Sequence, residues 1–393
     1  MQITSQKHRF TLPEGVHFFN AATFSPMSRN VEAAAHAAIE KFTNPVGIKA
    51  SDFFDHADEV RRDFAKLINA DDPNSIAIVP STSYGMSTVA ANLHRKANLK
   101  AGNQILILDQ EFPNDFYCFE RVASQLSLEI KVLLRPEGIK IGKKWNAEIL
   151  EAITDKVALI VIPQVHWIFG TIFDLKKIAD KCQETSTLLV VDGTQSVGAM
   201  PFDVSEIKVD ALISACYKSL LGAYQTGFAY YGPFFDDGVP LEESWMNRLD
   251  SHLFSKLTNL QPEYKPKAQR YNVGEYSNFT GLPISGAALK EILEWTPTGI
   301  QAYCKSLSKP FEAAFEAIGC EFEEEEFRAG HLFGITLPEH VTDLLKVQKT
   351  LAEAKIMVAV RGKNIRVSPN VYNEPSDFEA LLKALQSILS EGS

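Results

Sequence analysis

Two apolar segments of the sequence each lead into a side chain that could do chemistry. The run Leu188–Val191 ends at Asp192, and the run Ala211–Ser214 comes shortly before Lys218. Lys218 lies 26 positions after Asp192 (218 − 192), which leaves room for one crossover between parallel strands, so both side chains could lie at one edge of a sheet. An amine and a carboxylate placed together there suit pyridoxal phosphate (PLP). The amine forms an imine, or Schiff base, with the aldehyde, and the carboxylate keeps the pyridine nitrogen protonated.

The elements that must position these side chains are short apolar strands that alternate with helical patterns, from about residue 58 to 232. The seven predicted strands are Ser75–Val79, Gln104–Leu108, Glu129–Leu134, Val157–Pro163, Leu188–Val191, Ala211–Ser214 and Gly227–Tyr231. Strands with so few polar residues are typical of a sheet that helices cover on both faces. Helical patterns between them, such as Met86–His94 and Leu175–Cys182, therefore predict an α/β domain with a mostly parallel sheet. In such folds, ligands bind at the carboxyl ends of the strands.

The remaining third of the chain has a different pattern. Residues 240–278 are rich in aromatic, polar and proline residues, and we expect them to leave the first domain and help line the site. Pro283–Ile318 is predicted to be helical with interruptions, and strand-like and helical segments follow, up to a last helix near Asp377–Ser390. We interpret the acidic run Glu321–Glu326 as a solvated strand or strand edge. Together these segments predict a smaller α+β domain.

The expected division is a large cofactor-binding domain at residues 15–278 and a small C-terminal domain at residues 279–393, which residues 1–14 join. A chain of 393 residues is long enough for two such domains. Its 45% hydrophobic and 22% charged residues are typical of globular proteins. No stretch of about 18 apolar residues predicts a membrane span, and the polar N-terminus lacks a signal peptide, so we expect a cytoplasmic protein.

Charge and cysteine usage exclude other classes of function. The formal net charge of −10, without a basic stripe, argues against nucleic acid as a partner. The five cysteines are scattered and form no CxxC pair, so we expect reduced thiols, with neither a metal site nor a disulfide framework.

Five motifs in order along nearly the whole chain resemble the class V aminotransferase family. They include HFFNAATFSPMS (17–28), PSTSYGMST (80–88), VVDGTQSVGAMPFDV (190–204) and IRVSPNVYNEPSDFEALLKAL (365–385). This family of PLP enzymes contains cysteine desulfurases, kynureninases and proteins similar to isopenicillin N epimerase. The resemblance implies the PLP-dependent transferase fold type I, with a seven-stranded, mostly parallel sheet in the large domain. It also implies a homodimer that acts on an amino acid as its small-molecule substrate.

The resemblance assigns roles to individual residues. Lys218 matches the Schiff-base lysine and Asp192 matches the partner of the pyridine nitrogen, and these two would be catalytic. The other implied cofactor contacts are Gln195 at the phenolic oxygen, Thr82 and Ser83 in the phosphate turn, Phe112 over the pyridine face, Trp167 near the ring oxygen or substrate, and Tyr217 at the phosphate. Arg366 matches the arginine that binds the substrate carboxylate through a bidentate geometry that lysine lacks.

Some positions depart from the family pattern. The residue before the lysine is Tyr217, as in kynureninases, where desulfurases have histidine. No cysteine follows Cys320, so the persulfide-forming cysteine of desulfurases is missing and sulfur mobilisation is disfavoured. Arg270, Glu275 and Ser277 lie where relatives reach into the neighbouring subunit, although the usual threonine is absent.

Several residues keep two interpretations. Cys216 reads as a buried small residue, and His166 as a structural histidine or a general base. Arg361 is either a second anion-binding residue or a solvent-facing one. The reaction stays open as well: transamination is the family default, a lyase is the alternative, racemisation is chemically accessible, and a PLP-binding module without turnover belongs to another class of function.

Overall fold

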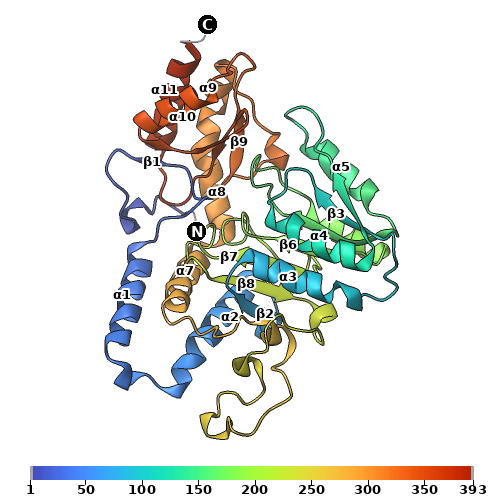
Figure 1. Cartoon of the computed structure of the whole chain (residues 1–393). Coiled ribbons are helices and arrows are strands. Elements are labelled where there is room, and N and C mark those ends of the chain that lie inside the picture. The colour runs from blue at the N-terminus through green and yellow to red at the C-terminus, as the bar shows by residue number, and fades with distance from the viewer. Residues whose placement is uncertain (1–2, 391–393) are drawn as a thin grey trace.

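The computed structural model describes residues 3–390, and its centre is a seven-stranded sheet (Figure 1). The strand order is β2-β8-β7-β6-β5-β3-β4, and only β8 runs antiparallel to its neighbours. The strands are β2 (Ile76–Val79), β3 (Gln104–Leu108), β4 (Glu129–Leu133), β5 (Val157–Pro163), β6 (Leu188–Asp192), β7 (Ala211–Ala215) and β8 (Gly227–Tyr231). The predicted α/β fold with a mostly parallel sheet is therefore confirmed.

Six of the seven strands are largely buried and mostly apolar, whereas the edge strand β4 exposes Glu129 and Lys131. Along β5, Leu159 and Val161 belong to one apolar cluster, whereas Ile160 and Ile162 belong to the other. Helices α3 (Thr82–Asn92) and α4 (Asn114–Leu126) contribute to the first cluster. The second cluster contains residues of α2 (Asp55–Leu67), α5 (Gly142–Ala152), α6 (Leu175–Glu184) and α7 (Gly281–Trp295).

The N-terminal helices pack against a helix from far along the chain. Both α1 (Arg29–Thr43) and α2 contact α7. In this contact the Glu291 carboxylate of α7 accepts a hydrogen bond of 2.8 Å from the Asn30 side chain of α1, and Lys290 of α7 forms a salt bridge with Glu59 of α2. Helices α1 and α2 are thus held partly by an element that follows the sheet in sequence, and α2 also contacts β2 directly.

The C-terminal part has its own sheet and its own apolar core. A three-stranded antiparallel sheet has the order β11-β12-β9, and β1 pairs in parallel with β10. Its core contains Phe19 together with residues between 307 and 389. The elements are β1 (His17–Phe18), α8 (Pro297–Ser308), α9 (Glu312–Ala317), β9 (Phe333–Thr336), α10 (Leu344–Glu353), β10 (Ile356–Met357), β11 (Ala359–Arg361), β12 (Asn364–Val367) and α11 (Pro375–Ser390).

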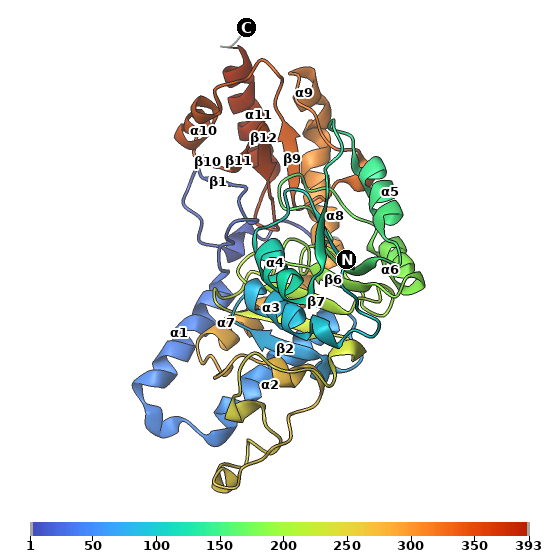
Figure 2. The ribbon, with the colours of Figure 1, turned by 45° about the vertical axis from the view of Figure 1, so that its right-hand side comes forward.

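The figures show how these parts are arranged. The elements of the C-terminal part gather at one end of the molecule in both views, and the segment around residues 240–265 projects at the other end (Figures 1 and 2). That segment contains only short 3-10 turns, among them η7 (Trp245–Asn247) and η8 (Phe254–Lys256). No helix within residues 3–390 is long and apolar enough to cross a membrane.

The interpretation of Glu321–Glu326 as a solvated strand is wrong for most of the run. Glu321 makes one isolated bridge to Thr336, and the chain then enters a 3-10 turn, η11 (Glu325–Phe327). Glu323 is buried, and its Oε2 accepts long hydrogen bonds of 3.4 Å from the Ile141 amide and the Thr171 hydroxyl. A carboxylate inside an acidic run can be buried when the fold supplies donors, which composition does not reveal.

Candidate active site

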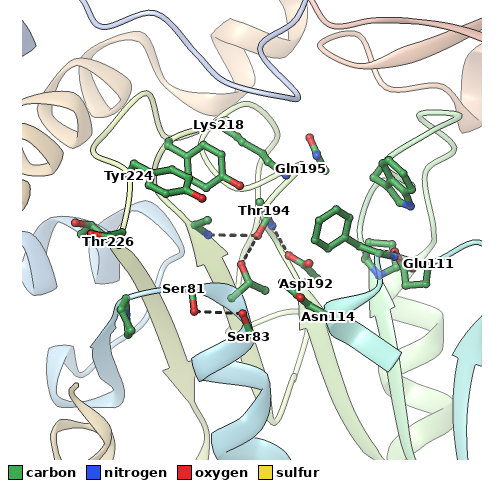
Figure 3. A pocket seen from close by; sticks show the side chains of 18 of the residues that line it. Ser81, Ser83, Glu111, Asn114, Asp192, Thr194, Gln195, Lys218, Tyr224 and Thr226 are labelled. Carbon is green, nitrogen blue, oxygen red and sulfur yellow. Dashed lines mark hydrogen bonds between the residues drawn. The ribbon is translucent and has the colours of Figure 1, made fainter. Parts of the chain in front are cut away.

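A cavity of about 450 Å³ opens at the carboxyl ends of the parallel strands (Figure 3). Its walls come from the segments that follow β2, β3, β5, β6 and β7, and from the segment that leads into β8. Because strand ends from distant parts of the chain converge here, this edge is where a doubly wound sheet binds its ligand. None of the lining residues comes from residues 240–278, so the expectation that this connector lines the site is wrong for the chain itself.

Asp192 and Lys218 lie in this one cavity, as their spacing predicts. Asp192 is the last residue of β6, and Lys218 follows the end of the parallel neighbour β7 by three residues. Both side chains are buried, with 8% and 7% of their surface exposed. The Thr194 amide donates a hydrogen bond of 2.8 Å to Oδ1 of Asp192, which fixes that oxygen.

The environment of Lys218 makes its amine easier to deprotonate than that of an exposed lysine. Burial lowers the pKa of Lys218 to about 8, and Arg366 lowers it further, while Asp192 and Asp115 oppose the shift. The amine lies 5.2 Å from the centroid of the Phe112 ring and 5.6 Å from that of the Tyr217 ring. A buried amine of this kind can act as a nucleophile or a base near neutral pH.

The segment that holds Lys218 is covered by residues near the N-terminus. Ser25 donates its amide to the Tyr217 carbonyl at 3.0 Å and its hydroxyl to the Lys218 carbonyl at 2.8 Å. The HFFNAATFSPMS motif therefore fixes the backbone around the lysine through Ser25, a role that could not be predicted from the motif itself.

One end of the cavity is lined with hydroxyl groups at the start of a helix. Ser81 caps α3 by accepting a hydrogen bond from the Tyr84 amide, and its hydroxyl lies 3.3 Å from that of Ser83. The Thr82 hydroxyl lies 3.2 Å from the Thr194 hydroxyl. The first amides of a helix have no partner within it, so hydroxyls and amides together form an anion site here.

Aromatic rings form the walls beside the amine. Phe112 and Trp167 meet edge to face, with ring centroids 5.6 Å apart and an interplanar angle of 87°. The Trp167 indole donates a hydrogen bond of 2.8 Å to the Gln110 carbonyl, which fixes the ring. Tyr217 also lines the cavity and packs on the exposed Tyr224, with centroids 4.7 Å apart. The cavity therefore offers aromatic rings against which a flat heteroaromatic ligand could pack.

Gln195 has one polar atom engaged and one free. Its Nε2 donates to the Ala22 carbonyl at 3.1 Å, whereas the buried Oε1 has no partner. A buried polar atom without a partner is costly, and a ligand in the cavity would relieve that cost.

Arg366 lies just behind the cavity wall rather than in it. Its guanidinium is almost fully buried and donates to the Thr23 hydroxyl at 2.6 Å and to the Trp167 carbonyl at 3.1 Å. Its Nε is buried without a partner, so the group still has a donor to offer. Burial and the neighbouring Arg361 lower the pKa of Arg366 to about 10, which leaves it charged at neutral pH.

Other candidates lie outside the cavity. His166 is fully buried between the rings of Trp145 and Phe169, and burial lowers its pKa to about 3, so it stays neutral in the core. Cys216 is buried and its thiol pKa is raised to about 12 by burial, which suits the interpretation as a small core residue. Arg361 is exposed, with its guanidinium 6.0 Å from the Trp167 ring centroid.

The three cross-subunit candidates also lie away from the cavity of their own chain. Arg270 donates hydrogen bonds to the Lys267 and Gly238 carbonyls, and the Ser277 hydroxyl donates to the Phe53 carbonyl. Glu275 is exposed and has a left-handed backbone. Among residues 3–390, no group of three or more His, Cys, Asp or Glu side chains is arranged to hold a metal ion.

The structure adds residues to the cavity that the sequence analysis missed. Thr194 links two walls, because its hydroxyl also accepts a hydrogen bond of 3.3 Å from the Ala215 amide. Thr226 lines the hydroxyl-rich wall, and its buried hydroxyl has no partner. Glu111 lines the wall near Asp192, where burial raises the pKa of its carboxyl to about 8. The one available signal was the position of each residue beside a strand end.

A close backbone approach holds the Trp167 loop against the C-terminal part. Gly170 has a φ of +70°, and a Cβ there would collide with the Leu332 carbonyl and lie 2.6 Å from the Phe333 Cα. Only glycine allows this contact, so the residue three positions after Trp167 joins the cavity wall to β9.

Comparison with known proteins gives a consistent result. The sequence model of the family described as Aminotransferase class-V matches residues 16–368. The uncharacterized aminotransferase YcbU of Bacillus subtilis is 26% identical over 363 residues, which cover 91% of this chain and 89% of YcbU.

Solved structures with the same fold are also similar over their full length. The apo structure of a cysteine desulfurase from Thermococcus onnurineus NA1 has a TM-score of 0.85 at 20% identity and covers 100% of this chain and 99% of the other. A C-DES variant with glycine covalently linked to its PLP cofactor has a TM-score of 0.82 at 18% identity, over 97% of this chain and 99% of the other.

The cofactor that these comparisons indicate is PLP, and the cavity fits it. The volume of about 450 Å³ lies within the range of small-ligand sites, roughly 300–1,000 Å³. The Gln195 Oε1 and the Thr226 hydroxyl are buried polar atoms without a hydrogen-bond partner among the described residues, which a ligand could supply. The hydroxyls at the start of α3 suit a phosphate. A buried carboxylate and a buried amine complete the donor set.

Proposed function

This chain belongs to the class V aminotransferase family, and from that premise we propose that it transfers the amino group of an amino acid. It is a PLP-dependent enzyme, an aminotransferase or a related lyase. The observation that carries the proposal is the placement of Lys218 and Asp192 in one buried cavity with Arg366 behind its wall. When bound, PLP supplies an aldehyde that captures the substrate amine and a protonated ring that accepts electrons from its Cα.

The residues around the amine would bind and orient the cofactor. Lys218 would bind the aldehyde carbon covalently, and Asp192 would hold the proton on the pyridine nitrogen. Thr82 and Ser83 would bind the phosphate with the first amides of α3, and Tyr217 would add its hydroxyl. Gln195 would contact the phenolic oxygen.

The remaining wall would position the substrate. Phe112 would cover one face of the ring, and Trp167 would lie beside the substrate and exclude water. Arg366 would bind the substrate carboxylate with its free Nε and one Nη, so that Cα comes within reach of Lys218. Once the substrate amine has displaced it, the neutral Lys218 amine would take the proton from Cα and return it to the cofactor carbon.

A lyase is the second candidate. Its support is that the similar solved structures include a cysteine desulfurase and C-DES, a cystine C–S lyase. Against a desulfurase reaction, no cysteine lines the cavity, and Cys320, the last in the sequence, is buried with a thiol pKa raised to about 12. The second candidate is therefore a lyase reaction that needs no cysteine nucleophile.

Borohydride reduction tests the covalent assignment. The purified protein with PLP should be yellow, and borohydride should bleach it and fix the cofactor to the chain, as mass spectrometry of the peptide with Lys218 would show. Lys218→Ala should not retain reduced cofactor, whereas Lys208→Ala, which removes an exposed lysine, should behave as the native protein. Bleaching and cofactor retention by Lys218→Ala would refute the assignment.

A panel of amino acids then separates the reactions. A transaminase converts an amino acid to its 2-oxo acid and, with a second 2-oxo acid present, forms a new amino acid, whereas a lyase releases a fragment such as sulfide. Chromatography of the products together with a sulfide assay decides between them. A cofactor spectrum that stays unchanged with every amino acid would contradict both reactions.

We propose that the enzyme is a homodimer in the cytoplasm. Large apolar side chains are exposed beside the cavity, with 46% of Phe24 and 60% of Tyr224 accessible, and such patches are typical of association surfaces. A second copy would cover this patch, and the segment with Arg270, Glu275 and Ser277 could then contact the partner's cavity. The five free cysteines suit a reducing compartment.

A further inference from the structure

A carboxyl group that the proposed chemistry does not use lies against Asp192. Asp115 is in the first turn of α4, and its side chain is completely buried, with 0% exposed. The residue before it, Asn114, lines the cavity (Figure 3). Neither Asp115 oxygen meets an N–H or O–H donor from the described residues. A carboxylate in such surroundings would lose its hydration without compensation.

The polar group that Asp115 does meet is another carboxyl. Its side chain is within hydrogen-bonding contact of Asp192. Two carboxylate oxygens cannot hydrogen-bond unless one of them carries a proton, and two buried like charges in contact repel each other strongly. The contact therefore requires one proton on the pair.

The surroundings decide which member holds this proton. Asp192 has the Thr194 amide as a donor to one oxygen, whereas Asp115 has none. Burial raises the pKa of Asp115 well above its usual value, and the charges of Asp192 and Glu111 raise it further, while Lys218 opposes them. The other titratable group nearby is the Cys118 thiol one turn along α4, whose pKa burial raises to about 12. The neutral state thus suits Asp115, which has no donor among the described residues to compensate a buried charge.

We infer that Asp115 is a positioning residue: it carries a proton in the folded protein and donates it in a hydrogen bond to Asp192. With the Thr194 amide on the other side, this bond would fix the Asp192 carboxylate in one orientation. The inference rests on the proposed role of Asp192, because the orientation matters where that carboxylate holds the pyridine nitrogen of PLP.

The position in α4 offers a contrast that supports this assignment. An acidic residue in the first turn of a helix ordinarily gains from being charged, since the helix dipole favours negative charge there. At Asp115 there is neither solvent nor a hydrogen-bond donor from residues 3–390 to compensate the cost of burying the charge, so the helix dipole alone does not stabilise the charged form. A carboxylic acid at this position serves as a hydrogen-bond donor, which asparagine could also provide with nearly the same shape.

Infrared difference spectroscopy tests the proton directly. The native protein minus Asp115→Asn, near neutral pH and with cofactor bound, should show the C=O stretch of an un-ionised carboxylic acid, which shifts in heavy water. A carboxylate band in its place would overturn the inference. The same difference measured without cofactor reports on the proton even if the proposed function fails, so the two failures are distinguishable.

Cofactor binding tests the consequence. Asp115→Asn keeps a donor and should retain the native PLP affinity within about threefold. Asp115→Leu removes the donor and should weaken PLP binding about 10- to 100-fold, the range for one hydrogen bond to a charged group. Glu120→Gln, which changes an exposed carboxyl on the same helix, is the control and should leave the affinity unchanged.

Two outcomes would contradict the inference. One is an Asp115→Asn protein that loses as much PLP affinity as Asp115→Leu, because a donor would then not suffice. The other is an Asp115→Leu protein with native affinity, because no positioning would then be needed. Circular dichroism and thermal unfolding show whether each variant is folded. If Asp115→Leu does not fold, Asp115→Ala replaces it, and the infrared arm with Asp115→Asn still decides where the proton lies.

Discussion

Burial of a single amine sets the pH range in which the cavity can react. Lys218 has a lowered pKa of about 8 because it is desolvated, and the nearby Asp192 carboxylate only partly offsets that loss. An ammonium group has no free electron pair, so the reactive fraction grows as pH rises through the pKa.

The pH dependence of cofactor uptake follows from this. The rate at which the cofactor-free protein takes up PLP should rise up to about pH 8 and level off above about pH 9. If the amine had the ordinary pKa of lysine, the rate of PLP uptake would continue to rise well above pH 9. Stopped-flow absorbance at a series of pH values measures it, with Lys218→Ala as the blank. A rate that climbs steadily to pH 10.5 would contradict the lowered pKa.

Arg366 should contribute to substrate binding but not to cofactor binding. Lysine at this position keeps the charge but cannot replace the planar guanidinium, which also donates to Thr23 and to the Trp167 carbonyl. Arg366→Lys should raise the KM for the amino acid by about tenfold or more and leave the cofactor spectrum unchanged. Steady-state kinetics and PLP titration check this, with the exposed Lys363→Ala as the control. A normal KM would remove Arg366 from the substrate site.

At the scale of residues, the sequence predicts those site residues that lie at or just after the end of a predicted strand. Asp192 and Lys218 could be predicted because the two apolar strands and the gap between them are apparent in the amino-acid sequence. The roles of Asp115 and Glu111 could not be predicted, because they depend on the approach of these side chains to Asp192 and on the donors that are missing there. The roles of the cofactor-binding and substrate-binding residues stay predictions.

At the scale of elements, the strands themselves were predictable from the sequence, whereas the contacts between distant segments were not. All seven strands of the large sheet were predictable as short β-branched or apolar runs. Six of them are largely buried, which removes polar residues, whereas the edge strand β4 exposes Glu129 and Lys131. The burial of Glu323 was not predictable, since the Thr171 hydroxyl and the Ile141 amide that serve it are distant in sequence. The approach of Gly170 to β9 was likewise invisible without coordinates.

The Gly170 joint can be tested by a paired substitution. Gly170→Ala should destabilise the fold by more than about 2 kcal/mol, because alanine disfavours a φ of +70° and its Cβ would collide with the backbone of β9. Gly102 has a φ of +81° with open space around it, so Gly102→Ala should cost only about 1 kcal/mol. Urea unfolding measures both, and equal losses would show that the collision is relieved elsewhere.

At the scale of the whole molecule, an exposed aromatic patch borders the cavity. Phe24 packs on Tyr217 and Tyr224 with ring centroids 5.5 and 6.2 Å apart, yet nearly half of it remains accessible. The division into domains at residues 15–278 and 279–393 also belongs to this scale and stays a prediction.

Association should depend on this patch. Light scattering should give about twice the chain mass of 43.7 kDa for the native protein. Phe24→Glu should shift the mass towards one chain, because a charge would be buried in the interface at high cost. Leu345→Glu, at an 80% exposed position on α10, should remain at twice the chain mass. A native protein of single-chain mass would contradict the homodimer.

The pairing of β1 with β10 joins positions 17 and 356, which are 339 residues apart (356 − 17). During synthesis on the ribosome, His17 leaves the exit tunnel long before its partner strand has been translated. The strands between residues 76 and 231 can assemble in that interval, while the leading segment waits. Since Ser25 contacts the carbonyls on either side of the Tyr217–Lys218 bond, the finished pocket is a late product of translation. A nascent chain released before β10 would lack the strand that pairs with His17 and Phe18, a few residues before Ser25.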